Sequence, residues 1–284
     1  MMKQLLRQSL SSLSYQAMRF TNGTDTGLRI LMYHRVTDAH PHERLCVPVK
    51  AFAEQMSYLD DEDYHTVTIS QVADWLAGRA ELPTRAIAIT FDDGYEDNFL
   101  YAYPELARYG FRACFFVPSG FIESGATASY AAADRPMTWG QLHELVRDHQ
   151  EIGAHSVTHR KLTRLRTEEM RWEVQHCKEV LEQGLGHAMM LFCYPAGDYD
   201  ASVWEAVQRT GYRAACTVKP GANHPGTDPL ALRRTEISAF DSLWDFEKKL
   251  AGAYDWLHAS VQAVQRAQHI VWGRGRETGG MGPS

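Results

Sequence analysis

The chain has few cysteines, and their spacing would build neither a disulfide framework nor a metal knot. Five cysteines are scattered over 284 residues, and no two of them form a C-x-x-C pair. This distribution argues against a disulfide scaffold and a structural zinc site, so we expect mostly reduced and buried thiols. The sequence also lacks a continuous apolar run long enough to span a bilayer.

An excess of positive charge is missing as well. The chain carries 29 Lys and Arg against 35 Asp and Glu, which gives a formal net charge of -6. Without a broad basic surface, nucleic acid is not an expected partner. The length allows one large α/β barrel or two modest domains, and either would bury a substantial core.

The two ends of the chain differ in composition from the middle. Residues 1–27 carry three basic residues and no acid before Asp25, and their apolar residues fall on one helical face. This basic amphipathic segment suits peripheral contact with an anionic membrane surface; a helix packed on the domain and a frayed leader are the alternatives. It lacks the continuous core of a signal peptide, so we expect a cytoplasmic protein, or one at the inner face of the membrane. Residues 268–284 are expected to form a disordered tail.

Strand-like and helix-like runs alternate between these ends, with little sign of a linker. The predicted strands are residues 29–36, 65–69, 86–91, 112–117, 151–155, 190–194, 214–218 and 233–237. The predicted helices are residues 51–59, 70–77, 98–109, 138–149, 167–184, 202–210 and 241–267. Such alternation predicts a parallel sheet with helices outside it, either open or closed into a barrel.

One apolar strand runs directly into two acids and a glycine. Residues 86–91 are followed at once by Asp92 and Asp93, which is how a buried parallel strand delivers carboxylates to a pocket at its C-terminal edge. The acidic run could instead cap the next helix through Asp97 or Asn98, but capping leaves the two acids at the strand tip unexplained. The spacing does not fit a calcium loop, which needs alternate ligands and a late glutamate.

A second strand-like run opens into two histidines. His155 and His159 stand four residues apart after an apolar stretch, a spacing that can direct two imidazoles at one ion. Together with Asp93 they would supply three ligands and leave an open position for a water, which the ion acidifies. Asp92, next to Asp93, could then remove the proton.

Two motifs together resemble the polysaccharide deacetylases with a NodB-homology domain. Residues 90–94 (TFDDG) look like the first motif of that family, and residues 155–159 (HSVTH) match the H-[ST]-x-x-H pattern of the second. The resemblance extends from about Leu28 to about Leu257, within a catalytic domain predicted over residues 28–267. It implies an α/β fold, a distorted (β/α) barrel of about seven units, with the site at the C-terminal ends of the strands.

The resemblance also implies roles for individual residues. Asp92 would be the general base, while Asp93, His155 and His159 would bind a divalent metal ion, with Zn²⁺ the expected one. The general acid has no clear candidate, because the late motifs of the family are not convincingly present. His34, near the end of the first strand, could donate the proton or merely buttress the pocket, and His258 is a weaker choice.

The third motif is where the sequence departs from the family. Members commonly carry R-x-P-[FY]-G, with the arginine holding the base carboxylate, whereas this chain has Cys193, Tyr194, Pro195, Ala196 and Gly197. We expect the last four of these residues to form a wall of the substrate groove, with a backbone N–H near Ala196 facing the acyl oxygen.

The missing cation needs a substitute, and two arginines on a later predicted strand could supply it. We hypothesise that Arg233 or Arg234 replaces the absent third-motif arginine.

The predicted function is metal-dependent hydrolysis that removes N-acetyl groups from amino sugars of a polysaccharide or glycan precursor. An N-acetylated carbohydrate is therefore the expected partner. The alternatives are a deformylase or deacetylase of a lipid-linked amino sugar, a catalytically weakened carbohydrate-binding homologue, and an amidohydrolase acting on a small amide.

Overall fold

The computed structural model describes residues 27–125 and 134–255. The chain divides into two compact units, one of residues 26–246 and one of residues 1–25 with 247–284. Nearly all of the predicted amphipathic segment, and the whole predicted tail, lie outside the described residues. Those two expectations stay predictions.

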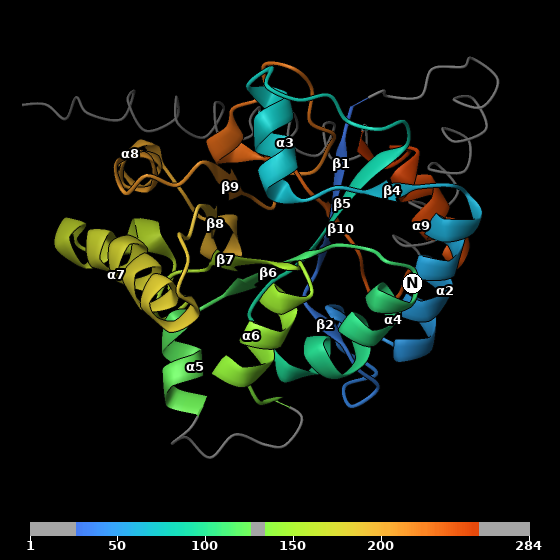
Figure 1. Ribbon diagram of the computed structural model, residues 1–284, viewed down its shortest axis with the longest axis horizontal. Coiled ribbons are helices and arrows are strands. Elements are labelled where there is room, and N and C mark those ends of the chain that lie inside the picture. Colours follow the sequence, from blue (N-terminus) through green and yellow to red (C-terminus); the bar gives the residue numbers. More distant parts are fainter. Residues whose placement is uncertain (1–26, 126–133, 256–284) are drawn as a thin grey trace, which may run out of the picture. The chain divides into compact units, whose positions relative to one another are not determined.

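A parallel sheet forms the centre of the larger unit (Figure 1). Its strands in the described residues are β1 (Arg29–Tyr33), β4 (His65–Thr66), β5 (Ala86–Phe91), β6 (Cys114–Val117), β7 (Glu151–Ala154), β8 (Leu191–Cys193), β9 (Ala214–Cys216) and β10 (Thr235–Glu236). Their order is β10-β1-β5-β6-β7-β8-β9, with β4 paired to the start of β5. A separate two-stranded sheet joins β2 (Arg35–Val36) to β3 (Cys46–Val47).

One short segment connects the two edges of the main sheet. Leu232 N–H donates to Ala215 O at 2.9 Å, and Leu232 O accepts from Thr217 N–H at 2.9 Å, so the segment bonds to β9. Three residues later, β10 pairs with β1. The strands therefore form a distorted barrel of seven units, as predicted, with a closure that depends on this segment.

Helices surround the sheet of the larger unit (Figure 1), as expected when each parallel strand needs a crossover connection. They are α2 (Val49–Asp61), α3 (Ile69–Leu76), α4 (Tyr103–Arg108), α5 (Ser119–Gly125), α6 (Trp139–Arg147), α7 (Thr167–Leu185) and α8 (Ala201–Arg209). Short helical turns are η1 (Asn98–Ala102), η3 (Leu162–Arg164), η4 (Pro195–Gly197) and η5 (Pro229–Ala231). The last described helix is α9 (Leu243–Leu250).

Two predicted helix ends are wrong. The helix predicted to stop at Gly184 continues to Leu185 and ends at Gly186, whose φ of 72° suits a glycine after a helix. Gly184 is instead a packing position, because a Cβ there would lie 2.2 Å from the Trp139 ring of α6. The helix predicted over 241–267 stops at Leu250, and turns follow over residues 251–254.

The core supports the edge of the sheet at which the strands end. Every residue of β1 is buried, and Phe91 at the end of β5 stacks on Phe115 of β6 with ring centroids 4.9 Å apart. All five cysteines are free and buried, which confirms the expected thiols. No helix within the described ranges is long and apolar enough to cross a membrane.

Candidate active site

The residues that follow the strands bring polar groups together at one edge of the sheet. Because all the strands are parallel, their C-terminal ends meet at the same edge. Asp92 and Asp93 follow β5, and His155 follows β7. His34 follows β1, and Cys193 is the last residue of β8. Segments up to 159 residues apart in the chain thus face one region, where two groups of side chains can be distinguished.

The first group consists of Asp93, His155 and His159, which we name the ligand group. Asp93 Oδ1 lies 3.1 Å from His159 Nε2 and 3.4 Å from His155 Nε2. His155 Nδ1 lies 2.7 Å from Cys193 O and, as the donor to that carbonyl, leaves its Nε2 with a free lone pair. Asp93 Oδ1 is buried, yet no described residue gives it a hydrogen bond. The three side chains therefore bring one possible ligand atom each to within 4.8 Å of one another.

This donor set fits a divalent metal ion. Two imidazole nitrogens and one carboxylate oxygen are the ligands of open zinc sites, and a cation would satisfy the unpartnered Asp93 oxygen. Burial raises the pKa of Asp93, but His155 and His159 outweigh it and hold that pKa far below its ordinary range. For His159 burial lowers the pKa, and the Asp93 carboxylate more than compensates, so the net shift is upward.

The second group consists of Asp92 and Arg234, which we name the base group. Arg234 is fully buried and donates to both Asp92 oxygens at 2.7 Å, a bidentate pair. Its Nε donates to Thr217 O at 2.8 Å, and a terminal nitrogen lies 3.1 Å from Cys193 Sγ. Burial raises the pKa of Asp92, but the charge and hydrogen bonds of Arg234 and two nearby histidines lower it below its ordinary value. Asp92 is therefore held as a carboxylate.

Backbone strain is concentrated at this edge. Four non-glycine residues there have left-handed backbones, with φ of 71° at Asp93, 62° at Ser156, 57° at His159 and 54° at Ala196. Such conformations cost about 1–3 kcal/mol each and persist only where the surrounding structure imposes them. Two of the four are members of the ligand group. The strained backbone at these residues lowers the stability of the fold and sets the direction of their side chains.

Residues 79–215, a segment that contains both groups except for Arg234, match the model of the family described as polysaccharide deacetylase. Over these residues the chain is similar to the polysaccharide deacetylase family. The Bacillus subtilis protein YxkH, which is named as a polysaccharide deacetylase, is 29% identical over 211 residues, covering 74% of this chain and 71% of that protein. The poly-beta-1,6-N-acetyl-D-glucosamine N-deacetylase of Escherichia coli is 26% identical over 138 residues, which span 46% of this chain and 20% of that enzyme.

Solved structures share the fold of this chain. The Streptococcus pyogenes deacetylase PplD, solved in complex with acetate, superposes with a TM-score of 0.72 at 24% identity, covering 79% of this chain and 98% of that one. IcaB from Ammonifex degensii superposes with a TM-score of 0.70 at 24% identity, covering 81% of this chain and 98% of the other. At these identities the likeness establishes the α/β fold of the deacetylase domain.

The third-motif segment turns two of its side chains inward, and the expectation that residues 194–197 form a wall of the substrate groove stays a prediction. Tyr194 is buried, and its hydroxyl donates to Leu230 O at 3.0 Å. Pro195 is also buried, whereas Ala196 is exposed. Gly197 N–H donates back to Tyr194 O at 2.8 Å. Ala196 is therefore the exposed residue of this segment.

The remaining predicted residues divide clearly between the site and the surface. Arg234 contacts Asp92, whereas Arg233 is directed to Pro220 O at 3.2 Å and lies away from the base group. His34 Nε2 lies 4.0 Å from Asp92 Oδ2, and no described residue gives its buried Nδ1 a hydrogen bond. His258 lies outside the described residues.

The acidic run after β5 does not cap a helix. Asp97 accepts from Arg35 Nε at 2.7 Å, and Asn98 donates to His34 O at 2.8 Å. Both residues therefore connect the first-motif loop to the segment after β1, and the capping alternative is wrong for both.

Sequence reasoning missed Glu173 in the middle of α7. This residue is fully buried and accepts hydrogen bonds from the loop that joins His155 to His159. A signal was present, because position 173 falls on the apolar stripe of Met170, Val174 and Cys177, where a charged residue is unexpected.

Proposed function

We propose that the protein is a metal-dependent hydrolase that removes N-acetyl groups from amino sugars of a polysaccharide or glycan precursor. The observation that carries this proposal is the division of labour between two adjacent acids. Asp93 converges with two imidazole nitrogens, and its buried oxygen has no hydrogen-bond partner among the described residues, while Asp92 is held as a carboxylate by Arg234. The similarity of residues 79–215 to the polysaccharide deacetylase family and the polysaccharide named for the Escherichia coli relative support the same chemistry.

Asp93, His155 and His159 would hold the metal ion. When bound, a divalent ion supplies a Lewis acid that lowers the pKa of a water and offsets negative charge at an acyl oxygen. The lone pair on His155 Nε2 is available because its Nδ1 is engaged with Cys193 O.

Asp92 is the proposed general base. It is ionised over the whole neutral range, since its pKa lies below the ordinary value. Arg234 holds both oxygens in one plane through its two hydrogen bonds, so the carboxylate is oriented before substrate arrives. Asp92 would take the proton of the attacking water as the carbon–oxygen bond forms.

Two further groups of the chain complete the proposed reaction. His34 Nε2 lies 4.0 Å from Asp92 Oδ2, so one bridging water or a small approach of the ring would let His34 receive that proton and deliver it to the leaving nitrogen. The backbone N–H of Ala196, an exposed residue, is the proposed donor to the acyl oxygen as negative charge develops there. The products would be acetate and a free amino sugar.

The test is acetate release from defined N-acetylated glycans. Chito-oligosaccharides and β-1,6-linked N-acetylglucosamine oligomers would be incubated with the protein, with and without a chelator, and acetate would be quantified. We expect chelator-sensitive release that zinc restores. If metal binds but no glycan loses acetate, the hydrolase proposal fails and a carbohydrate-binding role is favoured instead. A lipid-linked amino sugar should be assayed in parallel, because residues 1–27 would suit work at a membrane surface.

A further inference from the structure

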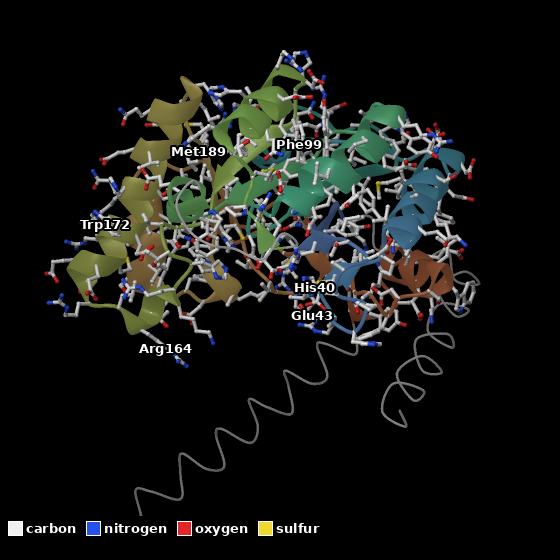
Figure 2. The ribbon with its side chains drawn as sticks, turned by 90° about the horizontal axis from the view of Figure 1, so that it is seen from below. His40, Glu43, Phe99, Arg164, Trp172 and Met189 are labelled. Carbon is white, nitrogen blue, oxygen red and sulfur yellow. The ribbon has the colours of Figure 1, made fainter. Side chains whose placement is uncertain are left out.

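A buried glutamate holds the loop between the two histidine ligands. Glu173 lies in α7 and is 0% exposed, whereas its neighbour Trp172 is 48% exposed on the outer side of that helix (Figure 2). Glu173 Oε2 accepts from Val157 N–H at 2.8 Å and from Thr158 N–H at 2.9 Å. Its other oxygen, Oε1, accepts from the Thr158 hydroxyl and from Arg160 at 3.4 Å. These four groups all donate hydrogen bonds to the carboxylate. Three of them, two backbone N–H groups and one hydroxyl, belong to the loop between His155 and His159.

The same loop is held on its other side by the start of α5. Ser119 N–H donates to Ser156 O at 3.2 Å, and Gly120 N–H donates to Val157 O at 3.0 Å. The approach at Gly120 is so close that a Cβ there would lie 2.7 Å from Val157 O. The loop thus has its carbonyls bonded from α5 and its N–H groups bonded from α7.

These contacts bear on the histidines because the loop has an unusual backbone. Ser156 and His159 both have left-handed φ, a conformation that such residues leave readily when nothing opposes the change. In that conformation His159 Nε2 points at Asp93 Oδ1, 3.1 Å away. Relaxation of the loop would turn the imidazole away from the common point of the ligand group.

We infer that Glu173 is a positioning residue for the metal site, which sets metal affinity by holding residues 156–159 in their strained conformation. This inference rests on the proposed metal-dependent function, and it assigns Glu173 no contact with metal or substrate. Removing its carboxylate leaves the N–H groups of Val157 and Thr158 without this acceptor. The cost is larger at Val157, whose hydrogen bond is buried, and it would favour rearrangement of the loop.

Two substitutions separate positioning from folding. Glu173→Ala removes every contact, whereas Glu173→Gln keeps an oxygen that can accept from both backbone N–H groups, and the Thr158 hydroxyl can rotate to accept from the new amide. Glu179→Gln is the matched control on the same helix. The Glu179 side chain is 55% exposed, and it contacts His176 and Gln175, which both belong to α7. Each full-length protein would be stripped of metal and titrated with Zn²⁺ by calorimetry, well below its unfolding temperature.

We expect Glu173→Ala to weaken Zn²⁺ affinity roughly 10–100-fold, as loss of an outer contact does at other metal sites. Glu173→Gln should lose about threefold or less, and Glu179→Gln should match the wild type, on the same scale. Substitution with Co²⁺ adds a spectroscopic signature, because its visible absorption reports ligand number and geometry, which should change in Glu173→Ala. A lower unfolding temperature without any change in affinity or spectrum would mean a structural role alone and would overturn the inference.

The outcomes also separate this inference from the proposed function. Zn²⁺ binding can be measured without a glycan. Wild-type protein that binds metal but releases no acetate would therefore contradict the proposed hydrolase function, and the positioning role of Glu173 could still be tested. If Glu173→Ala does not fold, Glu173→Asp carries the test, because the shorter side chain cannot reach the N–H groups of Val157 and Thr158 in the same way. Wild-type affinity in Glu173→Asp would then overturn the positioning role.

Discussion

The base group and the ligand group lie next to each other and differ in whether the protein alone satisfies them. Asp92 receives two hydrogen bonds from a buried arginine, so its negative charge is balanced within the fold. Asp93 meets two histidine nitrogens and keeps a buried oxygen without a hydrogen-bond partner among the described residues. The two adjacent residues thus differ in charge compensation. The Asp92 carboxylate is paired with Arg234, whereas a bound cation would be needed to satisfy the buried Asp93 oxygen.

The difference explains how two neighbouring carboxylates can take different roles. Buried charges must be paired, and the pairing partner decides what the charge is free to do. Arg234 holds Asp92 ionised and fixed, which suits a base, while an ion at Asp93 would be exchangeable and could carry a reactant. Changes that break one group should therefore leave the function of the other recognisable.

The largest expected effect comes from neutralising the base. Asp92→Asn should lower kcat by about 10²–10⁴-fold, because the amide cannot accept the proton of the attacking water. Zn²⁺ affinity should stay within a few-fold of wild type, since Asp92 belongs to the other group. Steady-state acetate release and calorimetric titration would measure the two quantities, and full activity would contradict the base assignment.

Removing the cation of the base group should cost stability. Arg234→Met leaves the buried Asp92 carboxylate without its partner, and we expect the free energy of unfolding to fall by about 3–5 kcal/mol. Arg233→Met is the control, with a change of about 0.5 kcal/mol or less because its side chain is on the surface. Urea unfolding of both variants checks the difference, and equal losses would contradict the pairing.

The same pair predicts a pH dependence. The folded pKa of Asp92 lies below its ordinary 3.8, so the pair stabilises the fold fully above that pH. As pH falls through the lowered pKa, this contribution is lost, and wild type and Arg234→Met should converge in stability. In activity, Arg234→Met should move the acidic limb of kcat/KM to higher pH, because the base loses the charge that lowers its pKa.

A smaller effect is expected from substitution of His34. His34→Gln should lower kcat by about 100-fold if His34 carries the proton to the leaving nitrogen. Zn²⁺ affinity should not change, and substrates with better leaving amines should lose less. A uniform loss across leaving groups would indicate that His34 only buttresses the pocket.

The smallest expected effect is a pH dependence of Zn²⁺ affinity, which arises because a proton and the metal ion compete for His159. Because Asp93 raises the pKa of His159 above 6.5, the metal-free protein holds a proton there that a metal must displace. Zn²⁺ affinity should therefore fall by about tenfold per pH unit below that raised pKa and level off above it. Calorimetry in buffers of different ionisation enthalpy would count the released proton; none released at pH 6 would contradict the shift.

Local sequence was enough for much of the fold. The strand predicted over residues 86–91 has those bounds in the structure. A short run of mostly apolar residues that ends in two acids is typical of a buried strand that ends at a polar site. The predicted end at Gly184 failed because a glycine that stops a helix and a glycine that admits a neighbouring indole look alike in sequence.

By itself, the sequence determined which residues carry the chemistry. The two acids at a strand tip and the two histidines four residues apart identify themselves by type and spacing, and in a parallel sheet such strand ends must meet at one edge. Tertiary structure decided between Arg233 and Arg234, because both precede β10 and local sequence does not tell which of two adjacent side chains faces Asp92. Tertiary structure also revealed Glu173, since a hydrogen bond between a helix and a distant loop depends on packing that no local pattern encodes.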